Sequence, residues 1–322
     1  MLWDFQSTRR LPITPLYHDG ILYLGDDAGF IYAVDAESGL GRWSVSTAGR
    51  ITGTPTLVDR ILYAPNDDFV SLDAVRGTLL LQVQSDRRQV SGLAVVDGMV
   101  IATGLRIPTG FVQAMNPVTA IEQWRVDLPA IVIGPPQLAG DRLVVATSGG
   151  ELLAIMTGTG RVAWRASFPG AIHYAPAVGT DTVFLLSTLR AGTVVTAVDR
   201  MTGIERWRAS LPGSPQLSPV IAGRLIVVAT GDTIIALDAQ TGATAWNHHQ
   251  ATSVSTLTAG TIGEVLVGTR DGSVEGLSTG DGTERWHWRS RHPLPVTGLV
   301  RTRGALYVVT GSHLIALAPP AV

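Results

Sequence analysis

Three arginines occupy one position of a repeated sequence pattern. Arg10, Arg50 and Arg88 each lie seven residues after a bulky apolar residue, and these apolar residues are Trp3, Trp43 and Leu81. The planar guanidinium group suits carboxylate and phosphate, because it donates two parallel hydrogen bonds to either. The three arginines therefore predict a binding site for a small anion or for an acidic group of a peptide or protein.

Three further polar residues occur near the start of two predicted strands. His173 and Tyr174 belong to the segment HYAP, and Gln216 belongs to the segment QLSP. We assign all three to the same ligand-binding site as the arginines, and we predict no catalytic residue. The alternative is an enzyme in which the arginines bind an anionic substrate and His173 or Tyr174 transfers a proton.

The histidine-rich segments lack the spacing of a metal site. His248 and His249 are consecutive, so on a strand their side chains point to opposite faces. His287 stands between Trp286 and Trp288, which is typical of an outer strand with the two indoles facing inward. The paired carboxylates of the segments GDDAG and NDDF are typical of turns. The sequence therefore predicts no metal site and no cofactor.

The composition excludes several classes of protein. The formal net charge of -2 gives no overall positive field, so we predict no nucleic-acid partner. All 24 basic residues are arginines, which excludes Schiff-base lysine and P-loop chemistry, and the chain has no cysteine. It contains no run of 18 apolar residues, so we predict no membrane insertion. The compartment is cytoplasmic if Met1 is the native start, and extracytoplasmic if the chain is an excised or mature domain.

The positions of the bulky residues define eight repeats in the 322-residue chain. The register points are Trp3, Trp43, Leu81, Trp124, Trp164, Trp207, Trp246 and Trp286. Their spacings are 40, 38, 43, 40, 43, 39 and 40 residues, a period typical of four-stranded propeller blades. From Trp286 to the C-terminus there are 36 residues, so the first three residues of the chain would complete one more repeat.

Each repeat contains four short runs of strand-forming residues between turns rich in Gly, Asp and Asn. The last repeat supplies only three strands before Leu317, so we expect residues 2–5, LWDF, to supply the fourth. Closure of this kind removes an open sheet edge. We therefore predict an all-β fold, an eight-bladed β-propeller of four-stranded antiparallel blades, in which residues 1–322 form a single domain closed by the N-terminal strand.

A phrase with fixed Asp, Gly and Trp recurs at the end of the repeats. It reads AVDRMTGIERW at 197–207, ALDAQTGATAW at 236–246 and AVDAESGLGRW at 33–43. An Asp that opens a tight turn accepts backbone N–H bonds, and the Gly takes the left-handed backbone conformation. The Trp on the outer strand buries a large area against the neighbouring sheet. These residue types predict a structural role for the phrase.

The pattern A-x-D-x-x-T-G-x-x-x-W resembles the tryptophan-docking motif of pyrroloquinoline-quinone (PQQ) type β-propellers, and weaker copies cover the whole chain. That family contains quinoprotein dehydrogenases, the outer-membrane assembly scaffold BamB, and propeller domains of bacterial sensor proteins. The resemblance to the enzymes implies a quinone on the propeller axis, a bound Ca²⁺, a Trp floor and usually two adjacent cysteines.

This chain departs from the enzymes of the family. It has no cysteine, seven of its eight Trp belong to the docking register, and repeats of 38–43 residues leave little room for the insertions that build the enzymes' active site. The resemblance therefore favours a non-enzymatic binding or scaffold propeller that recognises a protein, a peptide or a small anionic ligand. We expect the site on the face that carries the loops from the outer strand of one blade to the inner strand of the next.

Overall fold

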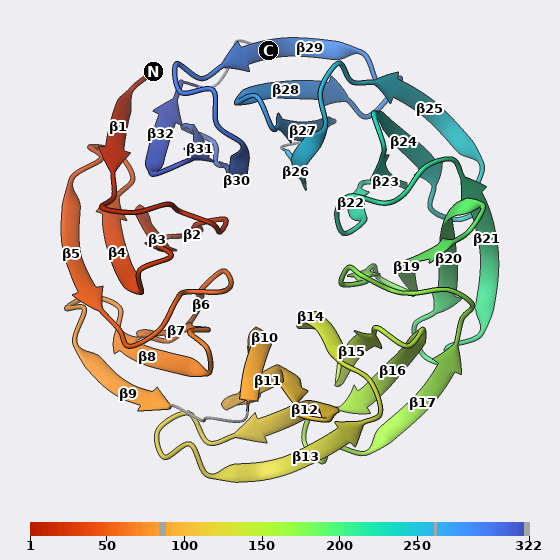
Figure 1. Ribbon diagram of the computed structural model, residues 1–322, viewed down its shortest axis with the longest axis horizontal. Coiled ribbons are helices and arrows are strands. Elements are labelled where there is room, and N and C mark those ends of the chain that lie inside the picture. Colours follow the sequence, from red (N-terminus) through yellow and green to blue (C-terminus); the bar gives the residue numbers. More distant parts are fainter. Residues whose placement is uncertain (84–87, 261–262, 319–322) are drawn as a thin grey trace. The chain divides into compact units, whose positions relative to one another are not determined.

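The computed structural model describes residues 1–83, 88–260 and 263–318, and of Arg88 it describes the backbone alone. The regular secondary structure of these residues consists of β-strands alone, and the strands form eight antiparallel four-stranded sheets (Figure 1). They are the blades of an eight-bladed β-propeller, as predicted. The described residues contain no helix with the length and apolar character needed to cross a membrane.

The chain divides into two compact units, each of which contains four blades. Unit 1 comprises Met1–Asp86 and Thr252–Val322. Its strands are β1 (Trp3–Gln6), β2 (Leu16–His18), β3 (Ile21–Gly25), β4 (Phe30–Asp35), β5 (Gly41–Ser46), β6 (Thr56–Val58), β7 (Ile61–Ala64), β8 (Phe69–Asp73), β9 (Leu79–Val83), β26 (Val254–Ala259), β27 (Glu264–Thr269), β28 (Ser273–Ser278), β29 (Glu284–Arg289), β30 (Val296–Arg301), β31 (Leu306–Thr310) and β32 (His313–Leu317).

Unit 2 comprises Arg87–Ala251. Its strands are β10 (Arg88–Val96), β11 (Met99–Arg106), β12 (Thr109–Met115), β13 (Glu122–Leu128), β14 (Val132–Ala139), β15 (Arg142–Thr147), β16 (Glu151–Met156), β17 (Val162–Ser167), β18 (Ala177–Val178), β19 (Thr182–Leu189), β20 (Gly192–Asp199), β21 (Glu205–Leu211), β22 (Val220–Ala222), β23 (Leu225–Thr230), β24 (Thr233–Asp238) and β25 (Thr244–His249).

The N-terminal strand completes the last blade, as predicted. Strand β1 pairs with β32, in the sheet order β1-β32-β31-β30, and Trp3 stands opposite Ala316. In Figure 1 the first strand of the chain accordingly lies beside its last strand. The strand spans Trp3–Gln6 and not residues 2–5, although the amide of Leu2 also bonds to the carbonyl of Ala316 at 2.7 Å.

The core lies between successive blades of each unit. The second and third strands of a blade are almost fully buried, as in β23, where all six residues are buried. The outer strands alternate between half-buried and exposed positions, as in β5. Short β-branched runs bounded by turns thus fill the layers between blades, while the outer strands carry the polar residues.

Five Trp residues of the docking register each contact the turn of the following blade. The indole N–H of Trp43 donates to the carbonyl of Ala74 in the following blade at 3.0 Å, and its ring lies against Gly77. Gly77 has a φ of +70°, and a Cβ atom there would stand 2.7 Å from Trp43. The turn glycine is therefore required both for its backbone conformation and for the close approach of the indole. The same arrangement is found for Trp3, Trp124, Trp164 and Trp207.

Candidate functional site

The strands of each blade run between two opposite ends of the blade, which we call the loop edge and the turn edge. The loop edge carries the loops from the fourth strand of one blade to the first strand of the next, together with the turns between second and third strands. The turn edge carries the turns between first and second strands and between third and fourth strands. Arg10, Arg50, His173, Tyr174 and Gln216, which were predicted to form the site, lie in loops of the loop edge.

The structure brings Arg10 and Arg50 to either side of one turn in unit 1. The carbonyl of Arg10 accepts the amide of Asp27 at 3.0 Å, and the carbonyl of Asp26 accepts the amide of Ile51 at 3.4 Å. Each arginine stands beside a buried residue, Leu11 or Ile51, which anchors its loop. The arginines themselves are exposed, and no ion pair joins either of them to another residue of the part of the chain that the structure describes.

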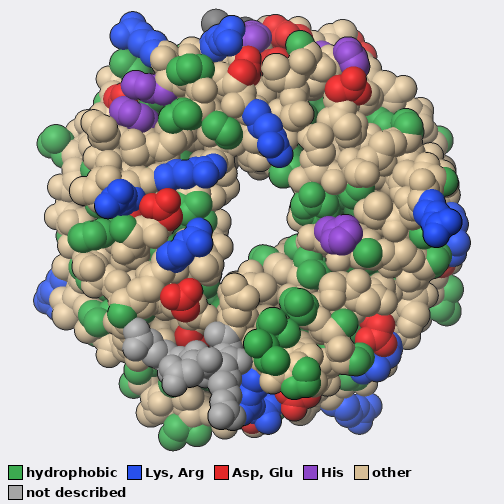
Figure 2. All heavy atoms as spheres, viewed as in Figure 1, with side chains coloured by type: hydrophobic (Ala, Val, Ile, Leu, Met, Phe, Trp, Pro, Cys, Tyr) green, Lys and Arg blue, Asp and Glu red, His purple; other side chains and the backbone are tan. Residues whose placement is uncertain are grey.

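Carboxylates lie next to these arginines, so this surface is not purely positive. Asp27, half-buried, belongs to the turn between the two arginine loops. Asp67 is exposed on the next blade, and its Oδ2 lies so close to Gly49 that an added Cβ there would approach it to 2.5 Å. Figure 2 shows arginine and carboxylate side chains close together over the blades β2–β5 and β6–β9. The surface therefore alternates positive and negative groups.

The turn between the arginines is held by the buried carboxylate of Asp26. Its Oδ1 accepts the amides of Ala28 and Phe30, each at 2.9 Å, and its Oδ2 accepts the hydroxyl of Tyr32 at 2.8 Å. Burial raises the pKa of Tyr32, so this hydroxyl stays a donor at neutral pH. Asp26 is thus a structural turn residue, as the segment GDDAG indicated, and it fixes the backbone that carries Asp27.

Arg88 differs from the other two arginines in its local structure. Its backbone opens strand β10 and pairs with Arg106 on β11, whereas Arg10 and Arg50 lie in loops. The side chain of Arg88 lies outside the described part of the structure. Its assignment to the ligand-binding site therefore stays a prediction.

In unit 2 the residues His173 and Gln216 lie at equivalent places in successive loops. Each follows a buried residue, Ile172 or Pro215. The amide of Gln216 bonds to Ala229 at 3.0 Å and its Nε2 donates to the carbonyl of Gly231 at 2.5 Å, while its buried Oε1 has no hydrogen-bond partner.

The neighbouring aromatic side chains of this loop differ in exposure. His173 is exposed and Tyr174 is half-buried. Together with Gln216 they offer hydrogen-bonding and aromatic surface without a fixed charge. Such groups suit recognition of a ligand or a partner surface as well as they suit proton transfer, so their geometry alone does not assign catalysis.

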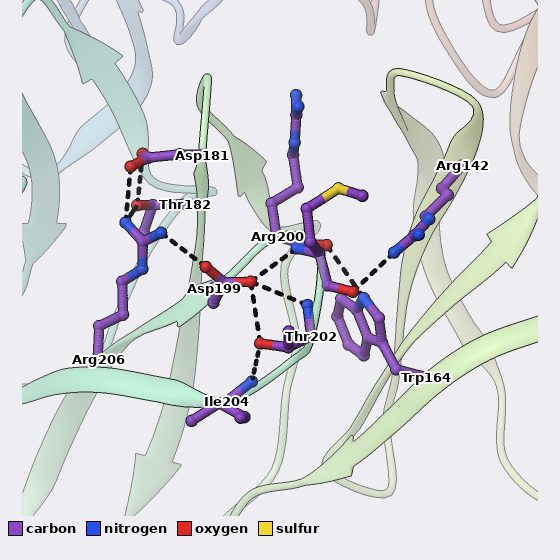
Figure 3. A network of polar contacts seen from close by, with 10 residues as sticks. Arg142, Trp164, Asp181, Thr182, Asp199, Arg200, Thr202, Ile204 and Arg206 are labelled. Atoms are coloured by element: carbon purple, nitrogen blue, oxygen red, sulfur yellow. Dashed lines mark hydrogen bonds and ion pairs between the residues drawn. The ribbon is translucent and has the colours of Figure 1, made fainter.

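The turn edge carries a charged network that the sequence did not reveal (Figure 3). Asp199 accepts the amides of Met201 and Thr202 at 2.9 Å and the Nη2 of Arg206 at 2.7 Å. Arg206 also bonds to Asp181 at 2.8 Å, in the turn between β18 and β19. Arg206 thus joins two turns of one blade, and its charge is balanced by the two carboxylates, so the three groups together keep one net negative charge.

Replacement of Asp199 by Asn should reduce the loss of unfolding free energy that acid causes between about pH 4 and pH 2. The Arg206 guanidinium, helped by the hydroxyl and amide of Thr202, holds the pKa of Asp199 at about 2, below its ordinary value of 3.8. A lowered pKa in the folded state contributes stability that is present above about pH 4 and lost as the pH falls through about 2.

The contribution of this exposed pair should be below about 1 kcal/mol. Urea denaturation at pH 7, 4, 3 and 2 measures it, and the difference between the wild type and Asp199→Asn should narrow toward pH 2. A difference of unchanged size at all four values would contradict this role.

Each unit has a cavity at its turn edge. The cavity in unit 1 has a volume of about 830 Å³ and lies between the β30–β31 hairpin and the turn after β4. The stacked rings of Tyr17 and Tyr307, with centroids 6.1 Å apart, line it together with Arg301. Two guanidinium nitrogens of Arg301, Nε and Nη1, are buried without a hydrogen-bond partner.

The cavity in unit 2 has a volume of about 1010 Å³ and the corresponding position, between the β18–β19 hairpin and the turn after β24. Its lining includes Arg206, which is already paired with two carboxylates, and Phe184, which stands where unit 1 has Tyr307. Sequence reasoning missed both cavities, since each arises from the packing of one blade against the next.

The residues of the chain do not fit the quinone site that the enzymes of the resembling family imply. The chain has no cysteine, and five of its indoles lie against turn glycines of neighbouring blades. The indole N–H of Trp286 donates to Oε1 of Glu264, and Trp288 packs against the core beside β30–β32. No catalytic step through a quinone follows from these residues.

The described residues contain two groups of three side chains with metal-ligating atoms close together, and both groups belong to unit 1. They are Asp4, His292 and His313, and Glu275, Glu284 and His287. None of the residues predicted for the ligand-binding site belongs to either group.

Comparison with known proteins gives one family over nearly the whole chain. The family model described as "Outer membrane protein assembly factor BamB" matches residues 1–107, 108–193 and 190–319. A protein of that name from Yersinia pestis is 25% identical over 310 residues, which cover 87% of this chain and 76% of the relative.

Solved structures share the fold. The crystal structure of BamB from Moraxella catarrhalis has a TM-score of 0.80 at 15% identity and covers 99% of both chains. A europium-containing methanol dehydrogenase has a TM-score of 0.79 at 14% identity, covering 96% of this chain and 85% of the other. At such identities a structural likeness reports the fold, which serves both a scaffold and an enzyme.

Proposed function

Because the chain belongs to the family of outer membrane protein assembly factor BamB, we propose that it is a non-enzymatic scaffold that binds a protein partner in the assembly of outer membrane proteins. The observation that carries this proposal is the match of the family model along residues 1–319, which extends over all eight blades. With this function the protein would act outside the cytoplasm, where outer membrane proteins are assembled.

The loop edge is the surface that we assign to the partner. Exposed Arg10 and Arg50 have no acidic partner among the described residues, whereas Arg42 and Arg206 at the turn edge are held by carboxylates at 2.6–2.8 Å. An arginine without a partner can pair with an acidic group of another protein at a lower cost, because no existing ion pair has to break.

The alternating charges favour a protein partner over a small anion. A small anion beside Arg10 and Arg50 would also lie near the carboxylates of Asp27 and Asp67, which repel it. A protein surface can present basic groups to those carboxylates and acidic groups to the arginines. In unit 2, half-buried Tyr174 on the loop edge is of a residue type enriched in protein interfaces.

Photo-crosslinking in cells of the host tests this assignment. A photoreactive amino acid placed at Arg9, exposed on the loop edge of unit 1, should crosslink a protein that mass spectrometry identifies as a component or a client of outer membrane assembly. The matched position is Glu37, exposed on the turn edge of the same unit. Crosslinks from Glu37 alone, or none from Arg9, would contradict the assignment of the loop edge.

Replacement of both arginines should separate binding from stability. Arg10→Ala with Arg50→Ala removes exposed side chains without ion pairs, so the free energy of unfolding should change by less than about 0.5 kcal/mol. The yield of the crosslink at Arg9 should fall several-fold. A sharp loss of stability in urea denaturation would instead assign the two arginines a structural role.

The anionic-ligand and enzyme alternatives have their own test. A thermal-shift screen with phosphate, carboxylic acids, Ca²⁺ and PQQ would detect a small ligand as a rise in the melting temperature. An activity found with any of these and lost on replacement of His173 by Ala would overturn the scaffold assignment.

A further inference from the structure

Three side chains that can ligate a metal meet at one place in unit 1, although they come from distant parts of the chain. Asp4 lies on β1, His313 opens β32, and His292 lies in the loop after β29. The Nδ1 of His313 is 3.0 Å from Oδ1 of Asp4, and the Nε2 of His292 is 4.0 Å from Oδ2. One donor atom from each residue lies within 4.8 Å of the other two.

The backbone fixes two of these residues relative to each other. In the β1–β32 ladder Gln6 stands opposite His313 and Asp4 stands opposite Ile315. Asp4 and His313 are therefore diagonal neighbours on one face of two paired strands, a separation that long side chains can bridge.

The loop that carries His292 is also held by hydrogen bonds. The amide of His292 donates to Oγ of Ser290 at 3.0 Å, and its carbonyl accepts the amide of Leu294 at 2.8 Å. The carbonyl of Leu294 accepts the hydroxyl of Thr310 at 2.8 Å, just before β32. The folded backbone thus places the imidazole of His292 next to that of His313.

We propose that Asp4, His292 and His313 bind one Zn²⁺ ion. Two imidazole nitrogens and one carboxylate oxygen are ligands that zinc prefers, whereas Ca²⁺ and Mg²⁺ prefer oxygen alone. Zinc binds these ligands at about 2.0–2.2 Å, so tetrahedral ligands lie about 3.3 Å from one another. The 3.0 Å distance from His313 to Oδ1 of Asp4 is close to this spacing. The 4.0 Å distance from His292 runs to the other oxygen, Oδ2, so His292 must approach for the three residues to ligate one ion. Three protein ligands leave the fourth position to water.

Binding requires one imidazole ring to turn. The rings of His292 and His313 are stacked, with centroids 3.9 Å apart and planes 12° apart, whereas zinc takes the lone pair that lies in the plane of each ring. The side chain of His292 is 41% exposed in a loop, and that of His313 is 15% exposed on a strand. His313 and Asp4 therefore form the fixed part of the site, and His292 is the ligand that moves to close it.

The histidine pair distinguishes this group from the other acidic and imidazole groups of unit 1. The group of Glu275, Glu284 and His287 has a single imidazole. Two carboxylates and one imidazole form a weaker and less selective zinc site than two imidazoles and one carboxylate.

The proposed ion would stabilise the position of β1, the strand that completes the last blade. Its ligands come from β1, from β32 and from the loop that joins the blade β26–β29 to the last blade, all within unit 1. Because zinc would bind the folded arrangement and not the unfolded chain, it should stabilise the pairing of β1 with β32 and slow hydrogen exchange at the amides of β1.

Zinc titration of the purified protein tests this proposal. The protein should carry no polyhistidine tag and the buffer no chelator. We expect one Zn²⁺ bound per chain, a rise of roughly 2–5 °C in the melting temperature at a zinc concentration about 100 times the Kd, and slower exchange of the β1 amides. Co²⁺ in place of Zn²⁺ should give the visible absorption of a four-coordinate site.

Two variants make the result specific. The double variant His292→Ala, His313→Ala should abolish binding, and Asp4→Asn, which keeps the shape of the side chain, should weaken it by at least about tenfold. The control is His249→Ala, which removes an imidazole that lies 3.7 Å from a single carboxylate, that of Asp232. The proposal is wrong if zinc gives the wild type no shift, or if the double variant binds zinc as well as the wild type and the control do.

Discussion

Removal of residues 1–6 is expected to lower the free energy of unfolding by about 4 kcal/mol or more. The deletion takes away β1, the outer neighbour of β32, and leaves β32 paired only with β31 and open at its other edge. It also removes Trp3, whose indole N–H donates to the carbonyl of Ala36 at 3.2 Å and whose ring lies against Gly39 of the next blade. Truncation of a packed Trp alone typically costs about 3–5 kcal/mol, and the lost ladder adds to this.

Urea denaturation of the truncated chain measures this effect. Removal of Met1 alone is the control, because its side chain is 65% exposed. The control should stay within about 0.5 kcal/mol of the full chain. A loss below about 1 kcal/mol for the six-residue deletion would contradict the closure of the last blade by the N-terminal strand.

Replacement of Trp164 by Ala is expected to cost about 3–5 kcal/mol. The indole is only 9% exposed, donates to the carbonyl of Arg200 at 3.0 Å, and covers Gly203 in the turn of the following blade. Figure 3 shows Trp164 and Arg200 in this arrangement. Loss of the indole leaves a void between two blades of unit 2 and an unpaired carbonyl.

A second variant changes the glycine on the other side of the same contact. A Cβ at Gly203 would stand 2.5 Å from the indole of Trp164, and the φ of +73° already disfavours any other residue. Gly203→Val should therefore be destabilising to a similar degree. Trp288→Ala is the control for loss of an indole outside the docking register, with a smaller expected cost because this residue is only half-buried. Equal costs at Trp164 and Trp288 would show that the docking contact adds nothing beyond burial of a large ring.

The fold followed from the sequence because its elements are set locally. A turn with Asp and Gly, followed by an indole that covers the turn of the next blade, has the same local requirements wherever the full phrase occurs. Asp199, Gly203 and Trp207 therefore identify their blade from its own sequence. The same logic placed the fourth strand of the last blade at the N-terminus. Its bounds differ by one residue because the ladder to β32, and not the apolar pattern, sets where the strand begins.

The candidate site could be predicted from the sequence only in part, because it depends on contacts between segments that are far apart in the sequence. The column of arginines is visible in the sequence, but Asp67 is brought next to the loop of Arg50 only by the packing of blades. Arg88 shares the spacing of the column yet opens a strand. Asp4 and His313 are 309 residues apart, so no local pattern could pair them.

The most direct test of the proposed scaffold function is a titration of the crosslinked partner, once purified, into the purified chain by isothermal calorimetry. We predict saturable binding with one partner per chain. The affinity should fall at least about tenfold when Arg10 and Arg50 are both replaced by Glu, and it should not change when Asp199 is replaced by Asn. The proposed function would be contradicted if no saturable heat appeared at about 100 μM of each protein. It would also be contradicted if the affinity were unchanged by replacement of the two arginines but fell on replacement of Asp199.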